Sequence, residues 1–132
     1  MLFTKECDYA IRIMRALSSG ELISVSRICD IEHLPSAMTY KITRKLEKSG
    51  FLKSCRGTNG GYALNKTLDE ISLYDICAAV DPEIVLLECM KDNYHCSMNN
   101  PKNPCLVHYE FCRLQSILVQ EMKQKSLAEL FG

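Results

Sequence analysis

The chain has 132 residues, of which 47% are hydrophobic and 24% charged, and its 16 basic residues are balanced by 16 acidic ones. This length suffices for one domain with one core and is too short for two independent domains. No run of about 18 apolar residues is present to span a bilayer, and the first residues lack the basic and apolar order of a signal peptide. We therefore expect a soluble, cytoplasmic protein that does not act at a membrane.

Two helices are predicted before residue 35. Thr4 is a suitable N-cap for the first helix, and Gly20 is a suitable end for it. Ser24 opens a second, shorter helix. The apolar residues that recur at helical spacing in the first helix are Ala10, Ile13, Met14 and Leu17.

A third helix is predicted between the Pro35–Ser36 start signal and the Ser49–Gly50 stop. Met38, Ile42 and Leu46 are four residues apart and predict its buried stripe. The opposite side is polar and mostly cationic, so we expect it in solvent. Its residues are Ala37, Tyr40, Arg44 and Glu47, flanked by Lys41 and Lys48.

Two short strands follow the third helix. Residues 51–55 and 62–64 have the composition of strands, and a glycine-rich turn joins them into a hairpin. Three helices followed by a two-stranded wing predict a winged helix-turn-helix, which is a mostly α fold with a small β element.

A short helix and a long loop are predicted after the wing. Ser72 and Asp75 have the spacing of a capping box, and Asp81–Pro82 ends the helix that they start. Residues 83–103 show no sustained periodicity, and a loop of this length in a small protein is usually functional or disordered.

A long C-terminal helix is predicted from the N-cap Asn103 and the following Pro104 to Leu130, about 27 residues and roughly 40 Å. Its apolar seam is typical of a helix that packs along another one, so we expect a homodimer contact; packing back on its own domain is the alternative. The seam contains Val107, Phe111, Leu114 and Leu118. The chain thus divides into a DNA-binding domain (1–82), a cysteine-bearing loop (83–103) and a dimerisation helix with its tail (104–132).

The basic residues are concentrated where DNA would bind. Residues 41–56 hold six Lys and Arg against Glu47 alone, whereas residues 69–93 hold seven acidic residues against Lys91. A local cationic face attracts a polyanion even when the net charge is zero; a merely solvated helix face is the alternative. The expected DNA-contacting residues are Ser36, Ala37, Tyr40, Lys41, Arg44, Lys48, Arg56, Gly57, Thr58, Asn59 and Gly60, with Gly61 allowing close backbone approach.

Eight cysteines in an intracellular chain indicate ligands, reactive thiols or small core residues rather than disulfides. Four of them lie in or beside apolar patterns and are expected to be structural. These are Cys7, Cys29, Cys55 and Cys77. No arrangement of residues typical of an enzyme active site is present, so we expect no catalysis.

The other cysteines lie near the long loop. Cys105, expected at the second position of the long helix, would be favoured as a thiolate by the helix dipole. His108 and Cys112 would share its side of the helix, although Cys112 in the seam is more typical of a core residue. Cys89 and Cys96 come from the loop. The spacings lack the paired C-x-x-C motifs of structural zinc sites, which favours an iron–sulfur cluster over zinc.

These residues resemble the Rrf2 family of winged-helix regulators, in particular its IscR-type and NsrR-type iron–sulfur sensors. The resemblance spans almost the whole chain and is carried by residues 4–10, 45–50, 56–64, 70–76, 79–80 and 127–130 together with the three cysteines. It implies that Cys89, Cys96 and Cys105 hold the cluster. It also implies either His108 or the partner subunit's Asp8 as a fourth ligand, so both a 2Fe–2S and a 4Fe–4S cluster stay open.

The chain departs from that pattern in two respects. Its cysteine spacings are longer than the usual five intervening residues, and Tyr40–Lys41 replace a Glu-Gln pair on the recognition helix, which implies a different operator.

We therefore expect a dimeric repressor that binds a palindromic operator and whose affinity is set by an iron–sulfur cluster sensing cluster status, redox state or nitric oxide. The alternatives are a cluster-free regulator controlled by thiols or by a partner, a zinc-structured DNA-binding protein and, more remotely, an iron–sulfur carrier.

Overall fold

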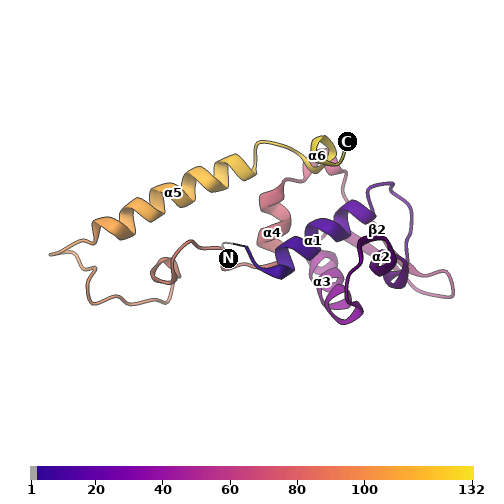
Figure 1. The fold of residues 1–132 in the computed structure, drawn as a ribbon, viewed down its shortest axis with the longest axis horizontal. Coiled ribbons are helices and arrows are strands. Elements are labelled where there is room, and N and C mark those ends of the chain that lie inside the picture. The colour runs from indigo at the N-terminus through magenta and orange to yellow at the C-terminus, as the bar shows by residue number, and fades with distance from the viewer. Residues whose placement is uncertain (1–2) are drawn as a thin grey trace.

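The computed structural model describes residues 3–132; Met1 and Leu2, which begin the segment compared with a signal peptide, lie outside the described residues. A domain of packed helices with a hairpin forms one end of the molecule, and one long helix extends away from it (Figure 1). The helices are α1 (Lys5–Ala16), α2 (Val25–Glu32), α3 (Ser36–Lys48), α4 (Leu73–Val80), α5 (Leu106–Met122) and α6 (Leu127–Phe131), the strands are β1 (Leu52–Cys55) and β2 (Gly61–Leu64), and the 3-10 turns are η1 (Leu68–Glu70) and η2 (Glu88–Met90).

The expected caps start the first two helices. The hydroxyl of Thr4 accepts from the backbone N–H of Cys7, and that of Ser24 from the N–H of Arg27. The helix α2 ends at His33, whose φ of 55° lies in the left-handed region. This conformation reverses the chain into α3, so α2 and α3 form a helix-turn-helix. Positive φ is uncommon for any residue other than glycine, even though histidine is enriched among the exceptions, and the sequence did not mark this turn.

The core lies where α1, α3 and α4 pack together. All four residues of the predicted α1 stripe are buried, as are Ile42 and Leu46 of α3, while Met38 is half-buried. Thr39 and Thr43 are also fully buried, because their hydroxyls donate to the carbonyls of Pro35 and Thr39 at 2.9 Å. The predicted amphipathic pattern is therefore confirmed, with two threonines added to it.

The wing is an antiparallel hairpin in which Leu52 pairs with Leu64 and Cys55 with Gly61. A third segment joins it, because Ile23 and Tyr62 exchange backbone hydrogen bonds of 2.9 and 2.8 Å. A Cβ at Gly61 would lie 2.2 Å from the carbonyl oxygen of Ile23, so only glycine fits there. The wing is thus tied directly to the segment that precedes α2.

The capping box at α4 is confirmed, since both the Ser72 hydroxyl and the Asp75 carboxylate make the expected bonds. The prediction of one helix from 104 to 130 is wrong. The helix α5 has 17 residues, about 26 Å, and starts after Cys105. Asn103 does not cap it, because the N-cap position is taken by Cys105, two residues later; Asn103 lies in a local turn, where its N–H donates to the side chain of Asn100.

The chain breaks between α5 and α6 because a second capping box lies there. The hydroxyl of Ser126 accepts from the N–H of Glu129, and the Glu129 carboxylate accepts from the N–H of Ser126. Leu127 is fully buried and donates its N–H to the carbonyl of Ile71 at 2.8 Å. The end of the predicted long helix therefore packs back on the winged domain, while α5 itself has no buried residue.

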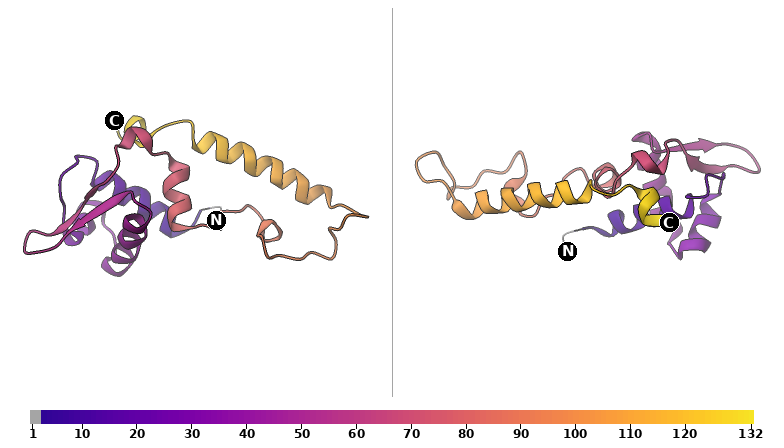
Figure 2. Two further views of the ribbon diagram at one scale, coloured as in Figure 1. Left: turned by 180° about the vertical axis from the view of Figure 1, so that it is seen from behind. Right: turned by 90° about the horizontal axis from the view of Figure 1, so that it is seen from above.

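The segment from 83 to 105 (the cysteine segment) runs beside α5 to the far end of the molecule. There the chain turns back into the start of α5, as the views from behind and from above show (Figure 2). Apart from η2 the cysteine segment is irregular, as expected. Among residues 3–132, no helix combines the length and the apolar character that crossing a bilayer requires.

We predict that Leu127→Ala lowers the free energy of unfolding by about 2 to 5 kcal/mol, because it leaves a cavity in the core. Leu130→Ala in the same helix is the matched control, since Leu130 is exposed, and a change within about 0.5 kcal/mol is expected for it. Urea unfolding measures both. Equal losses in the two variants would contradict the anchoring role of Leu127.

Candidate DNA-binding face and cysteine segment

The outer side of α3 is open to solvent. Ser36, Ala37, Arg44 and Lys48 are exposed, and Tyr40 retains 49% of its accessible surface. Glu47, which was expected on the same side, is half-buried because its carboxylate accepts a hydrogen bond of 2.6 Å from the hydroxyl of Ser54 on β1. The recognition helix and the wing are therefore joined by a direct polar contact.

A hollow of about 560 Å³ lies between α3, the start of α2 and the wing. Tyr40 and Arg44 line it from α3, and Arg56 and Gly57 line it from the wing. Ser24 and Ser26 complete the hollow at the start of α2. The sequence did not mark either as a DNA contact, although it did mark Ser24 as the N-cap of that helix. Backbone N–H groups at a helix start and the two arginines together suit a phosphate backbone.

The glycines at the tip of the wing would let its backbone come close to a bound DNA backbone. Gly57 has a φ of 118°, and the N–H of Gly60 donates to its carbonyl at 3.0 Å. A Cβ at Gly60 would lie 2.5 Å from the carbonyl oxygen of Cys55. Thr58 and Asn59 are exposed between them. This tight turn therefore presents small polar residues next to Arg56.

Lys41 is placed differently from the other expected DNA contacts. Its ammonium lies 2.7 Å from the carboxylate of Glu6 on α1, and Lys41 does not line the hollow. It sits on the flank of α3 that faces α1. The pattern of residues along α3 could not show this, because the acceptor is 35 residues away in the chain.

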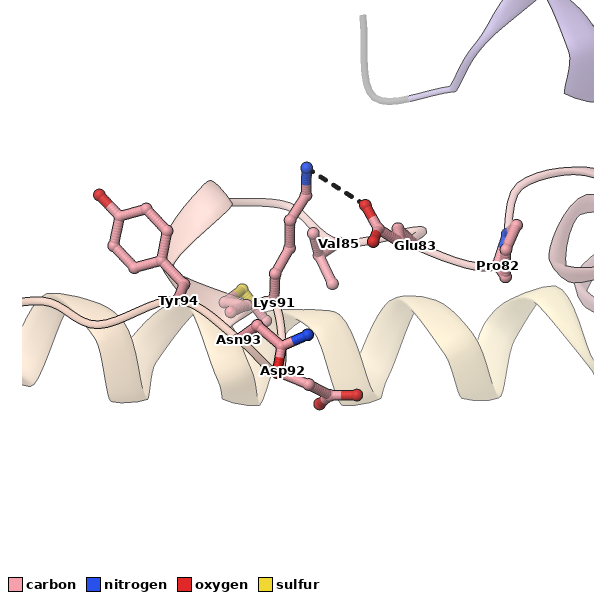
Figure 3. A pocket seen from close by; sticks show the side chains of 8 residues that line it. Pro82, Glu83, Val85, Lys91, Asp92, Asn93 and Tyr94 are labelled. Carbon is pink, nitrogen blue, oxygen red and sulfur yellow. Dashed lines mark ion pairs between the residues drawn. The ribbon is translucent and has the colours of Figure 1, made fainter.

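The first residues of the cysteine segment are attached to α5 by hydrogen bonds. The Gln115 side chain accepts from the N–H of Leu86 at 2.9 Å and donates to the carbonyl of Ile84 at 2.6 Å. Lys91 pairs with Glu83 at 3.3 Å and with Glu88 at 3.0 Å. Figure 3 shows Lys91 reaching across to Glu83, with α5 behind them. These contacts hold residues 83–91 as a loop against the helix.

The structure brings three of the candidate ligands together around one imidazole. Cys89 Sγ lies 3.4 Å from Nδ1 of His108, and Cys112 Sγ lies 3.5 Å from Nε2 of the same ring. The two ring nitrogens point in different directions, so the two thiols cannot share one metal ion with this ring. His108 and Cys112 do share one side of α5, as predicted.

The remaining candidates do not join this group. Cys105 is the N-cap of α5 and not its second residue, and its N–H donates to the side chain of Asn99 at 2.9 Å. Cys96 is half-buried in the segment, and Asp8 pairs with Arg12 on α1 at 3.1 Å. Within residues 3–132, no three His, Cys, Asp or Glu side chains are grouped closely enough to hold a metal ion.

All eight cysteines are free thiols. Cys7 and Cys77 are buried in the core, and burial together with Cys7 raises the pKa of Cys77 to about 12, so it stays a neutral thiol. Cys29 is half-buried. Cys55 was expected to be structural, and this is wrong: it is exposed because β1 points that side of the wing into solvent.

Known proteins resemble this chain over most of its length. The regulator NsrR of Shouchella clausii, an HTH-type transcriptional regulator, is 28% identical over 89% of this chain and 75% of its own. The oxidized form of CymR from Staphylococcus aureus has a TM-score of 0.76 with 20% identity, covering 99% of this chain and 96% of that one. IscR of T. potens has a TM-score of 0.72 with 18% identity, covering 96% and 83%. The two solved structures establish the winged-helix fold.

The family model Rrf2, described as an iron-dependent transcriptional regulator, matches residues 3–132. This match covers the winged domain, the cysteine segment and both C-terminal helices. The chain belongs to the Rrf2 family of transcriptional regulators.

Proposed function

We propose that the protein is a homodimeric, cytoplasmic repressor that binds a palindromic operator through α3 and the wing, and that an iron–sulfur cluster held at the cysteine segment sets its operator affinity. The observation that carries the DNA-binding part is the hollow lined by Tyr40, Arg44 and Arg56 from two elements. The observation that carries the sensing part is the contact between Cys89 and His108, which joins the segment to α5.

The operator interface consists of the exposed side of α3 and the wing tip. An α-helix fits the major groove, and its polar side chains reach base edges while flanking cations contact phosphates. Arg44 lines the hollow together with Tyr40 on the same helix and Arg56 on the wing. The expected contacts are those named from the sequence except Lys41, whose ammonium is paired with Glu6, with Ser24 and Ser26 added at the start of α2.

We predict that Arg44→Gln weakens operator binding at least tenfold, because it removes a cation from the interface. Lys66→Gln serves as the control, since Lys66 stacks on Phe51 away from the hollow and carries the same charge. Fluorescence anisotropy with operator DNA measures both. Equal binding by the Arg44 variant and the parent protein would exclude this interface.

The donor set of the segment fits an iron–sulfur cluster by its chemistry. Three thiols and an imidazole are the ligand types that such clusters use. Cys89 and His108 already lie in contact, so we assign His108 as the fourth ligand, and Cys96 and Cys105 would complete the set after the segment rearranges. A bound cluster would supply sensitivity to iron, oxidants and nitric oxide. The residues themselves would fix the segment against the start of α5.

We predict that protein purified without oxygen contains iron and sulfide and that Cys96→Ala removes most of both. Cys55→Ala is the matched control, because its thiol is exposed on the wing, and it should retain the parent content. Elemental analysis, acid-labile sulfide and visible absorption measure this. Operator binding should then differ between the parent and Cys96→Ala but not between the parent and Cys29→Ala, whose thiol lies on α2 and does not line the hollow.

A second candidate is a regulator that uses these thiols without metal. Cys89 and Cys112 both touch His108, so two thiols lie on either side of one imidazole. A colourless, iron-free parent protein whose operator binding changes on thiol oxidation would favour this candidate. It would also contradict the cluster.

The dimer is proposed from the open side of α5. Val107 and Leu114 of the predicted seam retain 61% and 39% of their surface, and Ile117 beside them retains 45%. Phe111 and Leu118 are half-buried. A contiguous apolar ridge of this kind on a protruding helix is the usual mark of a protein interface, and a second copy offers an identical ridge.

We predict that Leu114→Glu converts the dimer to the 15.0 kDa monomer, because it places a charge in the seam. Ser116→Glu adds the same charge at an exposed position two residues on, which helical periodicity places on the far side of α5, and it should leave the dimer intact. Sedimentation equilibrium measures the mass. A dimeric Leu114 variant would place the interface elsewhere.

A further inference from the structure

A carboxylate on α1 faces the recognition helix. Glu6 lies in the first turn of α1, and its two oxygens accept hydrogen bonds from two lysines of α3. Lys41 Nζ donates to Oε1 at 2.7 Å, and Lys45 Nζ donates to Oε2 at 2.6 Å. Two of the six cations in the basic stretch are therefore bound to an acid of the same chain.

Glu6 is a persistent partner for these lysines. Its side chain keeps only 21% of its surface, so salt screens the pair less than a fully exposed one. The Lys41 ammonium, together with that of Lys45, holds the pKa of the Glu6 carboxyl below its usual range. The position in the first turn of a helix also favours a negative charge. Glu6 is thus ionised wherever the protein would meet DNA at neutral pH.

The two lysines have different roles in this contact. Lys45 also donates to the carbonyl of Val80 at 3.1 Å, which caps the end of α4. It is therefore anchored between three elements. Lys41 has Glu6 as its one ion-pair partner among residues 3–132, and 53% of its side-chain surface is exposed. Rotation about its side-chain bonds would release it from Glu6 toward solvent, and Lys41 is therefore the lysine that DNA could recruit.

We propose that Glu6 competes with DNA phosphate for Lys41 and so lowers the operator affinity of the protein. The inference rests on the proposed operator interface, which Lys41 flanks without lining its hollow. A phosphate that approached Lys41 would have to displace a carboxylate that is already bound at hydrogen-bonding distance. Without Glu6, Lys41 would add one cation to the contacts made by Arg44 and Arg56.

Salt dependence of operator binding measures this competition directly. Each phosphate that a lysine neutralises steepens the plot of log affinity against log salt by about 0.9. Glu6→Gln should therefore steepen the slope by about 0.9 and tighten binding several-fold at low salt. Lys41→Gln in the parent protein should leave the salt slope nearly unchanged, because Lys41 is bound to Glu6 and not to a phosphate. Its effect on operator affinity should therefore be less than about twofold. Adding Lys41→Gln to Glu6→Gln should restore the parent slope.

Two controls separate this mechanism from simpler ones. Glu21→Gln removes the same charge from an exposed site between α1 and α2, and it should leave the slope unchanged, whereas a long-range charge effect would act in both variants. Lys41→Gln keeps the Glu6–Lys45 pair and so tests the inference even if Glu6→Gln unfolds, which thermal melting detects.

The inference is overturned if Lys41→Gln weakens operator binding as strongly as Arg44→Gln, because Lys41 then already contacts DNA. It is also overturned if folded Glu6→Gln keeps the parent slope. A failure of Arg44→Gln to weaken binding is a different result, since it would reject the operator interface itself.

Discussion

The hydrogen bond from the Leu127 N–H to the carbonyl of Ile71 sets where α5 stands relative to the winged domain. No residue of α5 is buried, and only partly buried side chains such as Met122 at its end pack against the core, so packing of the helix body contributes little to its position. Its end is held instead, because Leu127 fills the core and Ser126 bridges to Ser72. Ser72 caps α4, and η1 connects it back to β2. A displacement of α5 would therefore reach α4 and the hairpin that carries part of the proposed DNA-binding face.

A second connection runs from the other end of α4. Val80 ends that helix, its carbonyl accepts from Lys45, and Lys45 is held by Glu6. The cysteine segment begins at residue 83, three residues after Val80. The segment is thus joined to the recognition helix through Lys45 and to the winged domain through α5 and α6. Energetic coupling between two sites requires a structural element whose conformation both sites can bias. A coupling free energy of about 1 to 3 kcal/mol is typical.

Much of the fold could be predicted from local patterns, because local physics decides those elements. The hydroxyls of Thr4, Ser24 and Ser72 cap the helices as expected, since each needs only a backbone N–H three residues ahead. Asn103 misled the prediction because the helix starts two residues later, at the N-cap Cys105, whose N–H donates to the side chain of Asn99. The break before α6 was missed because the Ser126–Glu129 capping box went unrecognised inside a stretch without Gly or Pro. Competing local bonds, and not weak propensity, decided both boundaries.

The candidate sites depend on contacts that no local pattern contains. The glycines of the wing, next to Arg56, predicted its close backbone approach, yet the start of α2 joins that face through the Ile23–Tyr62 bridge. Residue type marked Cys89 and His108 as candidate ligands, but their contact requires the segment to fold back over 19 residues onto α5. Lys41 shows the same limit most clearly. Its place in a cationic helix predicted a DNA contact. In the tertiary structure its ammonium is paired with the carboxylate of Glu6, so part of the positive charge of α3 is neutralised within the protein.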